Sequence, residues 1–248
     1  FTARAIRDKV DGIIVSPTNS SAAVTILKLA GAARIPVVIA DIGADSGEYV
    51  SYIASDNQEG SYQLGRVLVK AMRARNWDKG SVGIIAIPQK RANGKARTAG
   101  FMRALDEAGI KGADIRQQVD FSYRETYAYT RELIAAHPDL RALWLQGSDR
   151  YQAALDAISD SGRRGQILLI CFDAEPVFLD LIPKGVLVGA GMQQPFLMGE
   201  EAVAAMDAHL KGAAVPRRKR LPVLAVSAGN IDELLPVIRR NVLGIGSR

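Results

Sequence analysis

Short apolar runs rich in β-branched residues alternate with longer amphipathic segments along most of the chain. Because the apolar runs are nearly continuous, they predict strands buried on both faces, as in parallel sheets covered by helices. The strands are predicted at residues 12–15, 35–40, 82–87, 115–121, 142–145, 167–171 and 186–190. Helices are predicted at about residues 20–32, 58–74, 93–108, 123–136, 151–159, 176–182 and 195–210. This rhythm predicts a doubly wound α/β chain.

Polar residues that directly follow the predicted strands are the candidates for function. In an open α/β sheet, ligands bind at the carboxyl ends of the strands, where the loops converge. These positions are 16–18, Asp41, 89–95, 121–122, 147–149, Asp173 and 193–194. They hold carboxylates, amides, a lysine and aromatic rings, without a phosphate-binding glycine loop or a nucleophile elbow. Such groups suit hydrogen bonding to hydroxyls and stacking on an apolar sugar face.

The amino-acid composition excludes several kinds of functional site. The 248 residues include one cysteine, Cys171, and two histidines, so neither an internal disulfide, a zinc site nor a Cys/His nucleophile is supported, and no cofactor is expected. Cys171 lies in an apolar run and is interpreted as a buried residue. No apolar run is long enough to span a membrane.

A net charge of +6 raises the question of a nucleic-acid partner, and the basic residues include one block, Arg217–Arg220. The block lies between Pro216 and Pro222, and we interpret it as a solvated connector. Contact with an anion or nucleic acid is the alternative, which requires supporting cations from elsewhere on the surface.

Several segments, taken in order, resemble the ribose- and galactose-type periplasmic binding proteins. The first is Asp11-Gly12-Ile13-Ile14-Val15-Ser16-Pro17-Thr18-Asn19-Ser20, followed by the runs at 35–41 and 53–57. The later ones are Ala99-Gly100-Phe101, the run at 136–140, Phe172-Asp173 and Met192-Gln193-Gln194-Pro195. The resemblance covers essentially the whole chain.

The resemblance implies two doubly wound, Rossmann-like lobes with parallel sheets, joined by a three-segment hinge near residues 55–57, 193–194 and 221–223. One lobe would comprise 1–55 plus 194–222, and the other 56–193 plus 223–248, with the C-terminal tail packed on the second lobe. Family members begin with a strand and a helix ahead of the Asp11–Ser20 segment, so the N-terminal lobe is expected to be truncated in this sequence.

The resemblance also implies ligand contacts at Asp41, Phe121, Asp173 and Gln193, with the carboxylates accepting from hydroxyls and the ring stacking. The alternatives are a loop cap for Asp41, a helix cap for Asp173, a core position for Phe121 and a hinge contact for Gln193. Lys95 and Gly147 stand where ribose binders have an arginine and an asparagine, Ser16 replaces an amide, and Ile42 replaces an arginine after Asp41. These departures favour a hydroxyl pattern other than that of ribose, or a less polar ligand. The predicted ligand-binding set is Ser16, Asp41, Lys95, Phe121, Ser148, Asp173 and Gln193.

The predicted function is therefore that of a periplasmic solute-binding protein of a bacterial ABC-type transporter or sensor, and not of an enzyme. It would bind a small sugar or polyol, act as a monomer, and deliver its ligand to a membrane permease or a sensor kinase, without a nucleic-acid partner. The effector domain of a LacI-type regulator, which shares the fold, is the alternative. An enzyme on the same fold is the second alternative, and turnover of a sugar would identify it.

Overall fold

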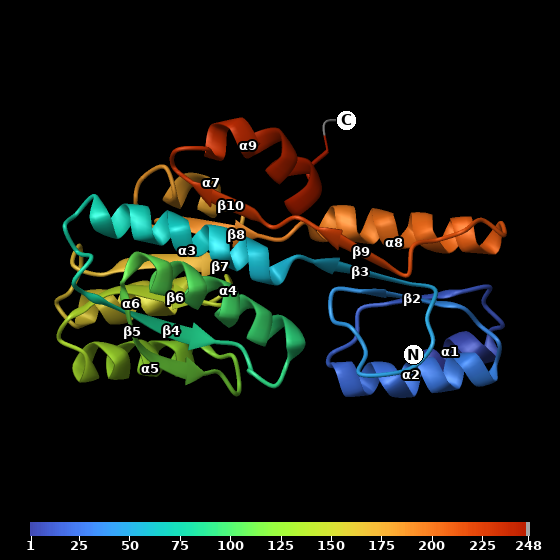
Figure 1. Cartoon of the computed structure of the whole chain (residues 1–248). Coiled ribbons are helices and arrows are strands. Elements are labelled where there is room, and N and C mark those ends of the chain that lie inside the picture. Colours follow the sequence, from blue (N-terminus) through green and yellow to red (C-terminus); the bar gives the residue numbers. More distant parts are fainter. Residues whose placement is uncertain (247–248) are drawn as a thin grey trace. The chain divides into compact units, whose positions relative to one another are not determined.

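The computed structural model describes residues 1–246 and divides into two compact units (Figure 1). Unit 1 comprises Phe1–Asp56, Gln194–Pro222 and the C-terminal stretch from Arg239, and unit 2 comprises Asn57–Gln193 and Val223–Ile238. The chain therefore passes between the units after Asp56, Gln193, Pro222 and Ile238. Among residues 1–246, no helix has the length and apolar character needed to cross a membrane.

Unit 1 is built on a four-stranded sheet in which all neighbouring strands are parallel. In sheet order, the strands are β1 (Ile13–Val15), β2 (Val37–Ala40), β3 (Ser51–Ser55) and β9 (Arg218–Leu221). The helices of this unit are α1 (Thr2–Arg7), α2 (Ser20–Ala32) and α8 (Pro195–Leu210). Successive residues of β2 point to opposite faces, so Val38 packs against α8 while Val37 and Ile39 pack against α2. Both faces of the sheet are thus covered.

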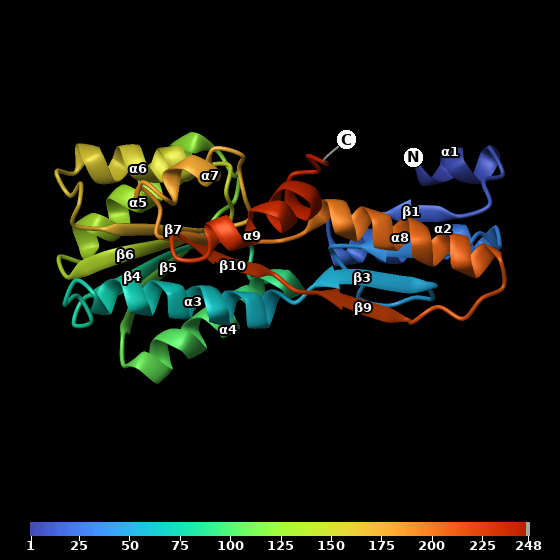
Figure 2. The same cartoon turned by 90° about the horizontal axis from the view of Figure 1, so that it is seen from above.

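Unit 2 is built on a six-stranded sheet that is parallel except at one edge. In sheet order, its strands are β10 (Leu224–Ser227), β8 (Gly189–Met192), β7 (Leu168–Phe172), β6 (Leu140–Leu145), β4 (Ser81–Ala86) and β5 (Lys111–Gln117). Its helices are α3 (Asn57–Arg73), α4 (Ala92–Ala108), α5 (Tyr123–Ala136), α6 (Tyr151–Asp160), α7 (Phe178–Leu181) and α9 (Ile231–Val237). Helices α3 and α4 cover one face of the sheet, and α5 and α6 cover the other (Figure 2).

The core of unit 2 lies between the sheet and the α3–α4 pair. Trp144 on β6 is fully buried and stacks on Phe101 of α4, with ring centroids 3.9 Å apart. Leu64 and Leu68 of α3 complete this layer against β7. Burying such large side chains contributes about 1.5–3 kcal/mol each, which fixes α4 against the sheet and so sets the position of its polar residues.

The basic block is not the connector that the sequence predicted. Residues Arg218–Leu221 form strand β9, which pairs in parallel with β3. Three of its cations lie beside carboxylates: Arg217 and Glu48 at 3.0 Å, Lys219 and Glu201 at 2.5 Å, and Arg220 and Asp56 at 3.9 Å. The block is therefore a sheet edge with paired charges.

The C-terminal tail groups with unit 2, as predicted, only as far as Ile238, and the stretch from Arg239 groups with unit 1. The chain passes from unit 2 to unit 1 within the π-helix η1 (Ile238–Val242). Arg240 lies 3.0 Å from the Glu200 carboxylate of α8, and Asn241 donates a hydrogen bond to Gln194 over 2.7 Å. These polar contacts attach the end of the tail to α8 and to the residue that precedes it. The hydrophobic pattern of the sequence could not predict contacts between polar side chains.

Candidate functional site

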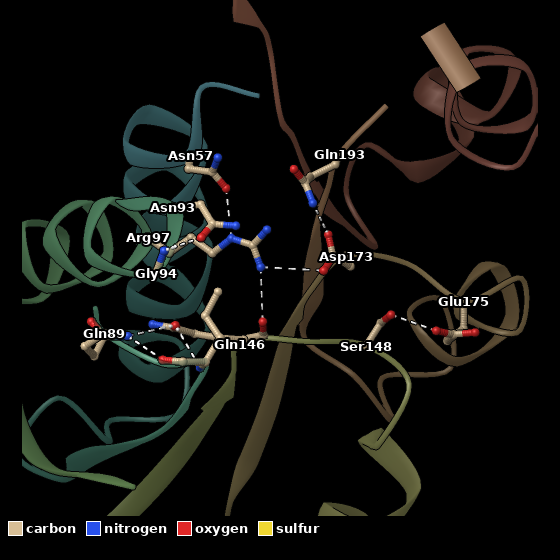
Figure 3. Close-up of polar contacts among 11 residues, drawn as sticks. Asn57, Gln89, Asn93, Gly94, Arg97, Gln146, Ser148, Asp173, Glu175 and Gln193 are labelled. Atoms are coloured by element: carbon tan, nitrogen blue, oxygen red, sulfur yellow. Dashed lines mark hydrogen bonds and ion pairs between the residues drawn. The ribbon is translucent and has the colours of Figure 1, made fainter. Parts of the chain in front are cut away.

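The carboxyl ends of the strands of unit 2 surround a buried arginine, Arg97, on α4 (Figure 3). Only 3% of Arg97 is exposed. Its Nε donates to Asn57 Oδ1 over 2.8 Å, and its Nη1 donates to the carbonyl oxygen of Gln146 over 3.1 Å. The guanidinium also lies 3.9 Å from the centre of the Phe172 ring. A buried charge needs such partners, because removing it from water is otherwise very costly.

Asp173, directly after β7, supplies the opposite charge. Its Oδ2 lies 3.5 Å from Arg97 Nη1, and its Oδ1 accepts a hydrogen bond from Gln193 Nε2 over 2.5 Å. About a third of the side chain is exposed. Asp173 is therefore a fixed carboxylate with one accessible side, which makes it an acceptor for a hydroxyl group.

A fully buried amide, Gln146, joins the end of β6 to the loop that precedes α4. Its Oε1 accepts from the backbone amide of Ile87, and its Nε2 donates to the Thr98 hydroxyl over 2.8 Å. The Thr98 hydroxyl in turn donates to Gln89 Oε1 over 2.7 Å. This closed network holds the loop against the sheet and keeps the Gln146 carbonyl aimed at Arg97.

Ser148 and Glu175 form a second polar pair after β6 and β7, respectively. The Ser148 hydroxyl is nearly buried and donates to Glu175 Oε1 over 2.7 Å. Its donor is therefore in use, while its oxygen can still accept a hydrogen bond.

Phe121 is half-buried and lies between two guanidinium groups rather than in the core. Arg91 and Arg150 stand 5.6 Å and 5.2 Å from the centre of its ring. Its backbone amide donates to Glu125 Oε2 over 2.9 Å, which holds the loop after β5. Both guanidinium groups lie within cation–π distance of the ring.

Lys95 is a predicted site residue of unit 2 that forms none of these side-chain contacts among the described residues. It is exposed on α4 and makes no ion pair among residues 1–246. Residues two apart on a helix lie on different sides, so Lys95 does not share the buried face of α4 that carries Arg97.

In unit 1, Asp41 follows β2 and adopts a left-handed backbone with φ of +66°. Its amide donates to the Ile53 carbonyl over 3.0 Å, and its own carbonyl accepts from the Tyr52 hydroxyl over 2.7 Å. Burial, followed by the nearby Asp41 carboxylate, raises the pKa of Tyr52 above its usual value. Ser16 is exposed at the end of β1.

Sequence reasoning included Gln89 among the strand-end candidates but missed Arg97, Asn57, Gln146 and Glu175. For Arg97, a signal existed in the helical periodicity. It shares the buried face of α4 with Gly94, Phe101 and Ala104, and a charge in the apolar stripe of a helix indicates a buried partner. Gln146 and Glu175 gave no comparable signal, because their roles depend on residues distant in sequence.

The described residues contain no group of three histidine, cysteine or acidic side chains that could hold a metal ion. Cys171 is fully buried, and this burial strongly raises the pKa of its thiol. The site thus presents fixed hydrogen-bond donors and acceptors.

Comparison with known proteins identifies the protein family to which the chain belongs. The family model described as periplasmic binding protein domain matches residues 2–214, and the chain belongs to this family. The chain is 30% identical over 220 residues to the ribose import binding protein RbsB of Bacillus subtilis, covering 88% of this chain and 69% of that protein. It is 27% identical over 208 residues to the D-ribose/D-allose-binding protein of Pseudomonas aeruginosa, covering 82% and 63%.

Solved structures agree on the fold. A periplasmic solute-binding protein of an ABC transporter from Actinobacillus succinogenes with bound D-allose aligns with a TM-score of 0.85 at 21% identity, covering 94% of this chain and 83% of that chain. The periplasmic component of the arabinose ABC transporter from Shewanella, bound to L-arabinofuranose, aligns with a TM-score of 0.83 at 21% identity, covering 98% and 82%. The expected α/β binding-protein fold is confirmed.

Proposed function

We propose that this chain is the solute-binding component of a bacterial ABC-type importer, that it works in the periplasm, and that it binds a small sugar or polyol without chemical turnover. Family membership supports the transport role over that of a LacI-type effector, because the matched relatives are named as import binding proteins. A membrane permease is the partner that such a role requires.

The observation that carries the proposal is the Asp173 carboxylate, held between Arg97 and Gln193 with one side accessible. A carboxylate fixed in this way accepts hydroxyl hydrogens without having to be reoriented when a ligand arrives, and this pre-organisation lowers the cost of binding. A polyhydroxylated ligand offers the matching donors.

We further propose that units 1 and 2 are the two lobes of the binding-protein fold and that each contributes ligand contacts. In unit 2 these are Asp173 and Gln193 as polar contacts, Phe121 as a stacking surface and Ser148 as an acceptor. In unit 1 they are Asp41 and Ser16. Lys95 is left out of the proposed set because Arg97, two residues further along α4, is the cation that lies beside Asp173.

A thermal-shift screen tests the proposal, with D-ribose, D-allose, D-arabinose, L-arabinose, D-tagatose, D-fucose and D-apiose as probes. A sugar at a hundred times its dissociation constant is expected to add about 2.7 kcal/mol to the free energy of unfolding, which raises the melting temperature. The Asp173→Asn variant is expected to lose most of this shift, because its amide no longer accepts at both oxygens.

Exposed Gln166→Ala serves as the control and is expected to keep the full shift, since among residues 1–246 its side-chain amide donates only to the Gly162 carbonyl, at 3.5 Å. Chromatography of each bound sugar after incubation is expected to recover it unchanged. If no sugar or polyol stabilises the protein, or if a product forms, the proposed function is wrong.

A further inference from the structure

A row of three cations on unit 2 lines a groove that the proposed function does not use. Arg66, Lys70 and Arg73 stand on α3 and are exposed. The groove has a volume of about 670 Å³ and lies where α3 packs against α4 and β10 (Figure 1). None of the residues that line it belongs to the candidate ligand site. We propose that this groove is a second binding site, which takes a small molecule with two or more phosphate groups.

The spacing of the three cations puts them on one side of α3. Counted from Arg66, Lys70 is four residues further along and Arg73 is seven, and residues three or four apart are neighbours on a helix surface. At a rise of 1.5 Å per residue, the row is about 10 Å long. A ligand that meets all three cations must therefore carry its negative charge over a comparable length, which several phosphate groups can do.

These cations lack the carboxylate neighbours that α4 offers to its own exposed arginine. There Arg103 lies 3.7 Å from Glu107, four residues further along the helix. On α3, Lys70 instead has Arg66 four residues before it and Arg73 three residues after it, and like charges so placed destabilise a helix. None of the three forms an ion pair among residues 1–246. The row is therefore an uncompensated positive charge.

The helix dipole accounts for only part of this row. Lys70 and Arg73 lie in the last turn of α3, where a positive charge is favourable. Arg66 lies a full turn earlier, and its guanidinium is 6.0 Å from the centre of the Tyr62 ring, which is the outer limit of a cation–π interaction. The charge of Arg66 thus adds repulsion with Lys70 without a compensating contact. Such a departure from local stability rules is expected where a residue serves a ligand.

The rest of the groove leaves this positive charge available. The acidic side chain among the lining residues is Glu107, and its two oxygens are engaged by the Tyr62 hydroxyl at 2.7 Å and by Arg103. Arg73 donates to the Ala108 carbonyl over 3.2 Å and keeps its other donors. A phosphate accepts two parallel hydrogen bonds from one guanidinium and carries a charge of about −1.5 to −2 at neutral pH. Two phosphate groups would therefore match the charge of the row.

Calorimetry with inorganic triphosphate tests the site, in a metal-free buffer of low ionic strength. The wild-type chain is expected to bind one triphosphate. Lys70→Gln is expected to bind it about fivefold more weakly, which is the upper value for the loss of one exposed charge pair. Citrate, a tricarboxylate with less charge, is expected to bind more weakly than triphosphate. The proposal is overturned if triphosphate shows no saturable binding, or if citrate binds equally or more tightly.

Arg124→Gln is the matched control, because it removes the same charge from α5, which covers the other face of the sheet (Figure 2). Its affinity for triphosphate is expected to stay within about twofold of the wild-type value, since charges further apart than the Debye length are screened. A loss equal to that of Lys70→Gln would show that triphosphate responds to net charge alone, and the groove would not be the site.

Arg66→Glu separates binding from folding. The new carboxylate would stand four residues before Lys70, in the orientation that favours a helix, so the urea midpoint is expected to equal or exceed that of the wild type. The same change is expected to weaken triphosphate binding by more than about tenfold, because an attraction becomes a repulsion. A lower urea midpoint would show that Arg66 is kept for stability, and unchanged binding would place Arg66 outside the site. Either result overturns the proposal, and neither measurement uses a sugar, so the proposed function is tested separately.

Discussion

Three residues of the candidate site share an uncommon backbone conformation in the segments that follow their strands. The φ angles are +66° for Asp41, +57° for Phe121 and +69° for Asp173. Aspartate tolerates this region because its short side chain can bond locally, whereas a bulky phenylalanine is a true outlier there. Such strain persists where the surroundings enforce it, and it concentrates at functional sites.

Substitutions at Phe121 are expected to separate stability from binding. Glycine adopts a positive φ without strain, while alanine retains a penalty of about 1–2 kcal/mol. This gain outweighs the greater freedom that glycine has in the unfolded chain, about 0.4–1 kcal/mol. Phe121→Gly is therefore expected to be at least as stable as Phe121→Ala in urea unfolding, although both variants lose the stacking surface and bind sugar more weakly.

Tyr129→Gly and Tyr129→Ala, placed within helix α5, provide the comparison. In a helix interior, glycine is expected to be less stable than alanine by about 0.8–1 kcal/mol, which is the opposite order. If Phe121 shows this helical order as well, its left-handed backbone is not the conformation in solution.

At this scale the sequence predicted which residues follow strands, and hence Asp173, Gln193 and Ser148 as candidates. The sequence could not predict which hydrogen-bond partners these three side chains have. Lys95 was taken as the counterpart of an arginine of the ribose binders, and Arg97, two residues further along, was not considered. The helical periodicity places Arg97 on the buried face of α4, but its partners lie on other elements, which that periodicity does not identify.

At the scale of elements, β10 forms an edge of the six-stranded sheet and is protected by one side chain. Asn230 Nδ2 donates to the Ala225 carbonyl over 3.0 Å, and its Oδ1 accepts from the Ser227 amide over 2.7 Å. The carboxamide thus takes the place that a peptide group of a further strand would occupy. Unprotected edges invite pairing with other chains.

Asn230→Ala is expected to lower the free energy of unfolding by about 1–3 kcal/mol, because two backbone groups lose their partner. Asn230→Asp keeps the acceptor but sets a carboxylate oxygen against the Ala225 carbonyl, and is expected to lose a similar amount. Urea unfolding measures both, and light scattering at raised concentration reports edge-to-edge association. Stability equal to wild type in both variants would mean that solvent satisfies this edge equally well.

The hydrophobic pattern of the sequence did not predict where some strands begin and end. The run 115–121 alternates well enough to predict a strand, but β5 ends at Gln117. Glu125 accepts hydrogen bonds from the amides of Val119 and Phe121, which turns the chain into a loop. Strand β9 was missed for the opposite reason: three of its four residues are exposed and charged, so it forms through backbone pairing with β3 rather than through an apolar pattern.

On the scale of the whole molecule, the two units differ in how much core each one holds. Among the largest fully buried side chains of residues 1–246, only Ile39 and Ile53 belong to unit 1, whereas Trp144, Phe101 and Phe172 are in unit 2. Unit 1 also exposes several large apolar side chains on α8, namely Phe196, Val203 and Leu210. Since buried apolar area drives stability, unit 1 is expected to be the less stable part.

Hydrogen exchange followed by mass spectrometry measures this difference directly. Peptides covering β1 and β2 are expected to exchange faster than those covering β4 and β6, because local opening costs less where less core is lost.

A matched pair of core variants tests whether the units open independently. The variants are Leu27→Ala in unit 1 and Leu68→Ala in unit 2, and each is expected to lower the free energy of unfolding by about 2–5 kcal/mol. Independent opening means that each variant accelerates exchange mainly in its own unit. Equal acceleration throughout the chain would instead show one cooperative structure, in which the four passages of the chain between the units transmit every loss of core packing.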